Sequence, residues 1–106
     1  MNKKRLKEEI DNITNQIIKR YKPEKVILFG SAAQGRFDLN SDLDFLIIKK
    51  KVPHYGIDRM RQIRRLVNTS FPCDFLVVKP EEIKQRLKWE DPFVEQMIYK
   101  GKTLYG

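Results

Sequence analysis

Three short apolar runs restrict the fold most, because each has the length of a strand and is too short for a buried helix. They cover residues 26–29, 45–48 and 75–78, and each is bounded by Gly, Pro, Asp or Lys. Runs of this length between such breakers are typical of strands that are buried on both faces. The sequence therefore predicts a small sheet with helices on both sides.

Helical periodicity surrounds these runs. From residue 3 to residue 20, apolar side chains recur every three or four positions until Pro23 stops the pattern. A second helix is predicted after the turn-forming VPHYG segment, with its arginines, Arg59 to Arg65, facing solvent or a partner. The apolar side of that helix is expected to consist of Ile57, Met60, Ile63, Leu66 and Val67.

The C-terminal third predicts two more helices. Pro80 follows the third strand, and Glu81 and Glu82 suit the first turn of a helix. Asp91 is placed as the N-cap of the last helix, with Pro92 at its first position. Gly101 ends that helix, and residues 102–105 are expected to form a short final strand. The aromatic residues Trp89, Phe93 and Tyr99 follow helical spacing and are interpreted as core or partner contacts rather than a base-stacking platform.

The predicted strands cover residues 25–30, 42–50 and 73–79, with helices between them. This order predicts an α+β (α/β-like) fold with a small mixed sheet of three to four strands. The 106 residues fit a single domain, 1–106, and are too few for two of ordinary size.

The charge balance restricts the partners without choosing one. A net charge of +8 attracts nucleotides, nucleic acids or acidic proteins, but the basic residues are spread along the chain. The single cysteine, Cys73, lies in an apolar run and is expected to be a buried thiol in a reducing compartment. No secretory signal or membrane-spanning stretch is recognised, so a cytoplasmic protein is expected.

The segment GSAAQGRFDLNSDLD, residues 30–44, carries the chemistry. Gly30 and Ser31 end a strand and open a turn, where backbone N–H groups favour a phosphate. Gly35 is expected to close that turn. Alternation sends Asp42 and Asp44 to one face of the next strand, where the two carboxylates can bracket one or two Mg²⁺ ions.

A third carboxylate on a neighbouring strand would complete a two-metal site. Asp38 lies in a loop, Asp58 at the front of a helix, and Asp91 is interpreted as a cap. Asp74 alone lies at the beginning of an apolar strand, as Asp42 does. Its position in a strand therefore favours Asp74 as the third carboxylate of the site.

Gly-Ser, ten residues and Asp-x-Asp together resemble the signature of the polymerase-β-like nucleotidyltransferase superfamily, most closely the minimal nucleotidyltransferase (MNT) proteins, antitoxins paired with HEPN-domain toxins. The resemblance covers essentially the whole chain. It implies that Gly30 and Ser31 hold nucleotide phosphates, that Asp42 and Asp44 bind two Mg²⁺ ions, and that Asp74 ligates one of them near the acceptor. It also implies transfer of AMP from ATP to a hydroxyl, a tyrosine, of a HEPN toxin.

One departure from the family concerns the residue after Ser31. Many relatives carry an arginine there, whereas this chain has Ala32. Phosphate binding then depends on backbone, metal, and Arg36 or Lys49. Three alternatives stay open: an antitoxin that neutralises its toxin by binding alone, a nucleotidyltransferase that acts on a small molecule as an oligomer, and a nucleic-acid-binding protein. The last ranks lowest, because three carboxylates at one site repel a polyanion.

Overall fold

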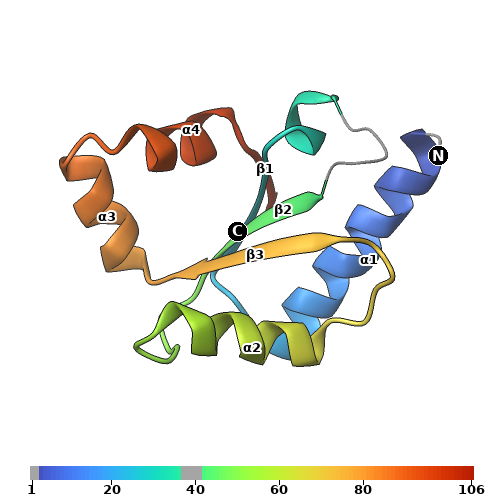
Figure 1. The fold of residues 1–106 in the computed structure, drawn as a ribbon, viewed down its shortest axis with the longest axis horizontal. Helices are drawn as coiled ribbons and strands as arrows, with labels where there is room; N and C mark the ends of the chain where they lie inside the picture. The colour runs from blue at the N-terminus through green and yellow to red at the C-terminus, as the bar shows by residue number, and fades with distance from the viewer. Residues whose placement is uncertain (1–2, 37–41) are drawn as a thin grey trace.

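The computed structural model describes residues 3–36 and 42–106. Within these ranges, four α-helices, a 3-10 turn named η1 and four strands alternate along the chain (Figure 1). Their bounds are α1 Lys3–Tyr21, β1 Lys25–Phe29, η1 Ala32–Gln34, β2 Leu43–Ile48, α2 Gly56–Leu66, β3 Cys73–Val78, α3 Pro80–Lys88, α4 Pro92–Lys100 and β4 Lys102–Tyr105. The predicted α+β fold class and the short final strand are confirmed.

The strands form one mixed sheet in the order β3-β2-β1-β4. β1 is antiparallel to both β2 and β4, whereas β2 and β3 are parallel. Because of these directions, the end of β1 lies beside the beginnings of β2 and β3. This end of the sheet is where the sequence predicts the chemistry.

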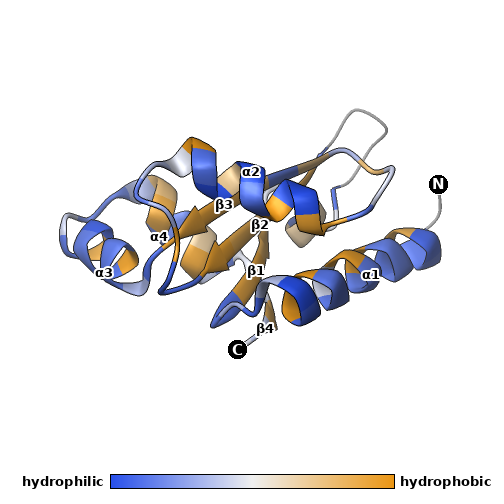
Figure 2. Ribbon diagram, turned by 90° about the horizontal axis from the view of Figure 1, so that it is seen from below, coloured by the Kyte–Doolittle hydropathy of each residue, from blue (hydrophilic) through white to orange (hydrophobic). Residues whose placement is uncertain are grey.

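Helices cover both faces of the sheet, as predicted. α1 and α2 lie on one face and contribute Ile13, Ile17, Tyr21 and Ile63 to the first core. Figure 2 shows the hydrophobic side of α1 turned toward the strands. α3 and α4 lie on the opposite face and build a second core, to which they contribute Ile83, Val94 and Met97.

The last helix begins as predicted. The Asp91 side chain accepts hydrogen bonds from the backbone N–H groups of Phe93, at 3.0 Å, and Val94, at 3.5 Å. Pro92 occupies the first position of α4, where its missing N–H leaves no donor without a partner. α4 therefore starts at a fixed point, which sets where its later residues lie relative to β1.

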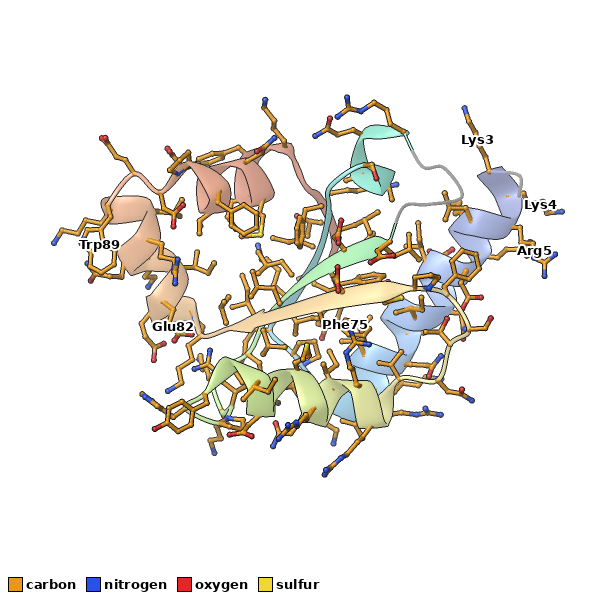
Figure 3. All side chains as sticks on the ribbon, in the orientation of Figure 1. Lys3, Lys4, Arg5, Phe75, Glu82 and Trp89 are labelled. Carbon is orange, nitrogen blue, oxygen red and sulfur yellow. The ribbon has the colours of Figure 1, made fainter. Side chains whose placement is uncertain are left out.

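The prediction that the arginines of α2 face outward is wrong for Arg59, whose exposed fraction is 5%. Its guanidinium pairs with Glu82 at 2.7 Å and donates to the carbonyls of Pro53, His54 and Val77. Figure 3 shows Glu82 at the end of α3 that lies next to α2. Five donors in a planar group satisfy several acceptors at once, which is what allows an arginine to be buried.

Several apolar side chains of the helices are exposed, so the three aromatic ones are not core residues, and their role as partner contacts stays a prediction. Trp89, Phe93 and Tyr99 are 70%, 56% and 72% exposed, and Ile57, expected on the buried side of α2, is 53% exposed. Trp89 projects from the end of α3, away from the sheet (Figure 3). Helical spacing sets which residues share a side of a helix, but the neighbouring elements determine how much of that side is covered. Within the described residues, no helix combines the length and apolar composition that crossing a membrane requires.

Candidate active site

Gly30 turns the chain sharply at the end of β1. Its φ of +76° is in the left-handed region that favours glycine. A Cβ atom added to Gly30 would overlap with Oδ2 of Asp44. The Asp44 carboxylate therefore lies directly against the bare backbone of the turn, which joins the two sequence motifs in space.

The turn continues through η1. The Ser31 carbonyl accepts hydrogen bonds from the N–H groups of Gln34, at 3.1 Å, and Arg36, at 2.8 Å. The Ser31 side chain does not cap η1. Gly35 ends the turn with a φ of +73°, as its position predicts, and the Arg36 guanidinium donates to the Gln34 side chain. A phosphate-binding role for Ser31, Gly35 and Arg36 remains a prediction.

Strand register brings two of the three predicted carboxylates together. Asp44 faces Phe29 across β1 and Asp74 across β3. Residues paired in this way project from the same face of a sheet, so Asp44 and Asp74 are neighbours on the α3–α4 face. Asp42 is exposed and directly precedes β2, so the predicted start of this strand was one residue too early. The loop residue Asp38 lies outside the described residues.

Asp42 and Asp74 act electrostatically on Asp44. Burial, followed by the negative charges of Asp74 and Asp42, raises the pKa of Asp44. A bound cation would relieve this repulsion, and an all-oxygen donor set is the kind that Mg²⁺ prefers. The chemistry of the three side chains thus fits a hard divalent ion held by Asp42, Asp44 and Asp74.

Asp74 differs from Asp44 in its surroundings. Its side chain is 64% exposed, and Oδ1 lies 3.8 Å from Nη2 of Arg64. In the part of the chain that the structure describes, no three or more His, Cys, Asp or Glu side chains are arranged as a metal-binding group. The described structure therefore places the carboxylates at adjoining positions but does not arrange them as the ligands of one metal ion.

Arg64 is a residue of this site that sequence reasoning missed. Its Nη2 atom also donates to the Cys73 carbonyl at 3.0 Å, and its guanidinium lies over the Phe75 ring, 5.8 Å from the centroid. Arg64 thus links α2 to the beginning of β3, the strand that carries Asp74. Four arginines share α2, and their spacing alone does not indicate which one reaches the strand.

Cys73 lies next to Asp74 but is buried on the opposite face of the sheet. Burial is the main reason that the pKa of its thiol is raised to about 12. Since a thiolate is the form that binds metals and attacks electrophiles, Cys73 is inert at neutral pH. The predicted buried thiol is confirmed.

Comparison with known proteins shows the family to which the chain belongs. Residues 11–106 match the family described as "Polymerase beta, Nucleotidyltransferase". The relative named "Putative protein adenylyltransferase MJ0604", from Methanocaldococcus jannaschii, is 28% identical over 96% of both chains. A second from the same organism, "Putative protein adenylyltransferase MJ1305", is 33% identical over 91% of this chain and 71% of its own length.

A solved structure agrees with the fold. A crystal structure described as that of a putative nucleotidyltransferase from Sulfolobus solfataricus superposes with a TM-score of 0.52 at 25% identity. The superposition covers 71% of this chain and 67% of the other. The family match spans the Gly30 turn and all three carboxylates, so the residues described above lie inside the shared region.

Proposed function

Because the chain belongs to the polymerase beta type nucleotidyltransferase family, as a minimal member, we propose that it transfers AMP from ATP to a hydroxyl group of a partner protein. The observation that carries the proposal is the contact between the Gly30 turn and Asp44, with Asp74 opposite on β3. A turn open to phosphates and a carboxylate near the acceptor are the two parts that such a transfer requires. The names of the two relatives support a protein as the acceptor.

The chain's own residues supply binding and proton transfer in the proposed reaction. The backbone of Gly30 and the hydroxyl of Ser31 bind the triphosphate, with the α-phosphate directed at Asp44. The carboxylate of Asp74 takes the proton of the acceptor hydroxyl, whose oxygen forms a bond to the α-phosphorus while the bond to the β-phosphate oxygen breaks and pyrophosphate leaves. Two Mg²⁺ ions held by Asp42, Asp44 and Asp74 would neutralise phosphate charge and lower the pKa of the acceptor.

The proposed acceptor is a tyrosine of a HEPN-family toxin, which makes the chain the antitoxin of a toxin–antitoxin pair in the cytoplasm. This proposal depends on the resemblance to minimal nucleotidyltransferases. The Arg64 contact gives it a structural consequence. Because Asp74 is 64% exposed and lies 3.8 Å from Arg64, a partner that docks beside β3 is expected to change this contact.

The test incubates the chain with labelled ATP, Mg²⁺ and a co-purified HEPN partner. We expect label on a partner tyrosine, and no label with the double variant Asp42→Asn, Asp44→Asn. That variant should remain folded, because burial and repulsion oppose the charge on Asp44 in the folded state. An unlabelled partner beside a chain that binds ATP and Mg²⁺ would contradict the proposal.

A second candidate function is neutralisation by binding alone. Ala32 occupies the position at which many relatives carry an arginine, and it packs against the first core instead of supplying a charge. Toxicity assays with the double variant discriminate the two functions. Retained neutralisation favours binding, whereas lost neutralisation with retained partner binding favours chemistry.

A further inference from the structure

A pocket of about 180 Å³ opens beside Gly30, between the end of β1 and α4. It is lined by Phe29, which pairs with Asp44 across the sheet and packs against the second core. The pocket therefore lies on the same face of the sheet as Asp44. Gly30, the first residue of the proposed phosphate-binding turn, also lines it. Figure 1 shows α4 beside β1.

The wall of the pocket is apolar and aromatic. Met97 is buried at its base, and the rings of Phe29 and Phe93 meet edge to face, with centroids 6.3 Å apart and an interplanar angle of 87°. Phe93 is nonetheless 56% exposed. A ring that is held at a fixed angle, with much of its surface in water, is a stacking surface for a planar group.

Polar side chains border this aromatic wall. Gln96 and Lys100 come from the same helix and line the same pocket. A glutamine amide carries both donors and an acceptor, and it can bind the edge of adenine through two hydrogen bonds. Gln34 also lines the pocket, but its side-chain oxygen already accepts from Arg36.

We propose that this pocket is the nucleobase subsite of the enzyme, with adenine stacked on Phe93, its edge at Gln96, and the phosphates passing Gly30 toward Asp44. The proposal rests on the proposed nucleotidyl transfer and adds to it the group that selects the base. Size supports it. Sites that enclose a whole drug-sized ligand measure roughly 300–1,000 Å³, so the smaller pocket beside Gly30 suits one part of a nucleotide.

Calorimetric titrations of ATP and of inorganic tripolyphosphate, both with Mg²⁺, test the subsite. We expect Phe93→Ala to weaken ATP binding on the order of 5- to 150-fold, the range for loss of one base–aromatic stack, and to leave tripolyphosphate binding unchanged. The matched control is Tyr99→Ala, which removes another exposed ring of α4 that does not line this pocket. Tyr99→Ala should change neither the affinity for ATP nor the affinity for tripolyphosphate.

A second variant keeps the test independent of any damage that Phe93→Ala does to the fold. Gln96 is exposed, so Gln96→Ala should fold normally, and we expect it to lose most of the preference for ATP over GTP. Unchanged ATP affinity in the folded Phe93 variant, or unchanged base preference in the Gln96 variant, would overturn the subsite alone. A parent chain that binds neither ATP nor tripolyphosphate would overturn the proposed function and the subsite together.

Discussion

At the scale of single residues, the site depends on two glycines that share a backbone conformation but differ in surroundings. Gly30 and Gly35 have φ values of +76° and +73°. An added Cβ would overlap with the Asp44 carboxylate at Gly30 and would meet nothing within 4 Å at Gly35. Gly35 is thus a matched control for Gly30: an alanine at Gly35 tests backbone strain alone, whereas an alanine at Gly30 also displaces the Asp44 carboxylate.

Replacing each glycine by alanine separates the two effects. Gly35→Ala should lower the free energy of unfolding by about 1–2 kcal/mol, the cost of a left-handed alanine. Gly30→Ala should cost more than this and also abolish nucleotidyl transfer, because Asp44 must move away. Urea denaturation and ATP titration measure the two quantities. Equal losses of stability in both variants, with transfer intact, would contradict the contact between Gly30 and Asp44.

At the scale of elements, the outer edge of β3 is covered by side chains of α2. The carbonyls of Pro72 and Val78 accept from the first residue of β2 and from the residue directly after this strand, at 3.0 Å each. By alternation, the carbonyls of the odd-numbered residues of β3 therefore face outward. Arg64 donates to the Cys73 carbonyl and Arg59 to the Val77 carbonyl. An exposed strand edge invites pairing with another chain, and these arginines occupy two of its three outward carbonyls.

Acid should weaken the link between α2 and α3 that Arg59 and Glu82 form. The hydrogen bond from Arg59 is the largest cause that lowers the pKa of Glu82. A carboxyl with a lowered folded pKa adds stability above its unfolded value near 4.5, and this stability is lost as pH falls through the folded value. Glu82→Gln should therefore cost about 1–2 kcal/mol at pH 7, and this deficit should become smaller as pH falls below 4.5.

Urea denaturation at both pH values checks this prediction, with Glu81→Gln as the matched control. Glu81 is exposed and lies beside Glu82 in the first turn of α3. The control should change stability by less than 0.5 kcal/mol, roughly the limit for a surface substitution. A Glu82 variant whose deficit does not become smaller at pH 3 than at pH 7 would contradict a contribution of the Glu82 charge to the link between the two helices.

The elements were largely predictable from the sequence because periodicity and breakers act locally. Pro23 and Asp91 mark helix ends through their own backbone and side-chain chemistry, and both helices end or begin beside them. The meeting of the carboxylates was also predictable in outline. Asp44 and Asp74 both lie near the start of an apolar run, and the parallel pairing of those runs aligns them.

The features that the sequence did not predict depend on contacts between distant elements. Arg59 is buried because two carbonyls of the loop before α2, one carbonyl of β3 and the Glu82 carboxylate surround it, and no local pattern encodes that set. Phe93 was interpreted as a core or partner contact, yet it lines a pocket whose other wall is the end of β1. Aromatic spacing on a helix does not reveal what the opposite element leaves open.

At the scale of the whole molecule, the two faces of the sheet are covered unequally. Among the described residues, the core beneath α1 and α2 contains twelve buried side chains, whereas the core beneath α3 and α4 contains six. Of these six, α3 supplies only Ile83. Regions with fewer buried apolar groups open at lower free energy than the rest of a fold, so the α3–α4 layer should open first.

Native-state hydrogen exchange measures this difference directly. Amides of α3 and α4 should exchange at least about tenfold faster than those of α1 and β2, which corresponds to about 1.4 kcal/mol in opening free energy. Uniform protection across both layers would contradict the unequal cores. Since Phe93 and Met97 of the weaker layer line the proposed base subsite, bound ATP should slow exchange in α4 more than in α1, because a ligand stabilises the closed form that binds it. The α3–α4 layer, which should open most readily, is thus the layer that bound nucleotide would stabilise.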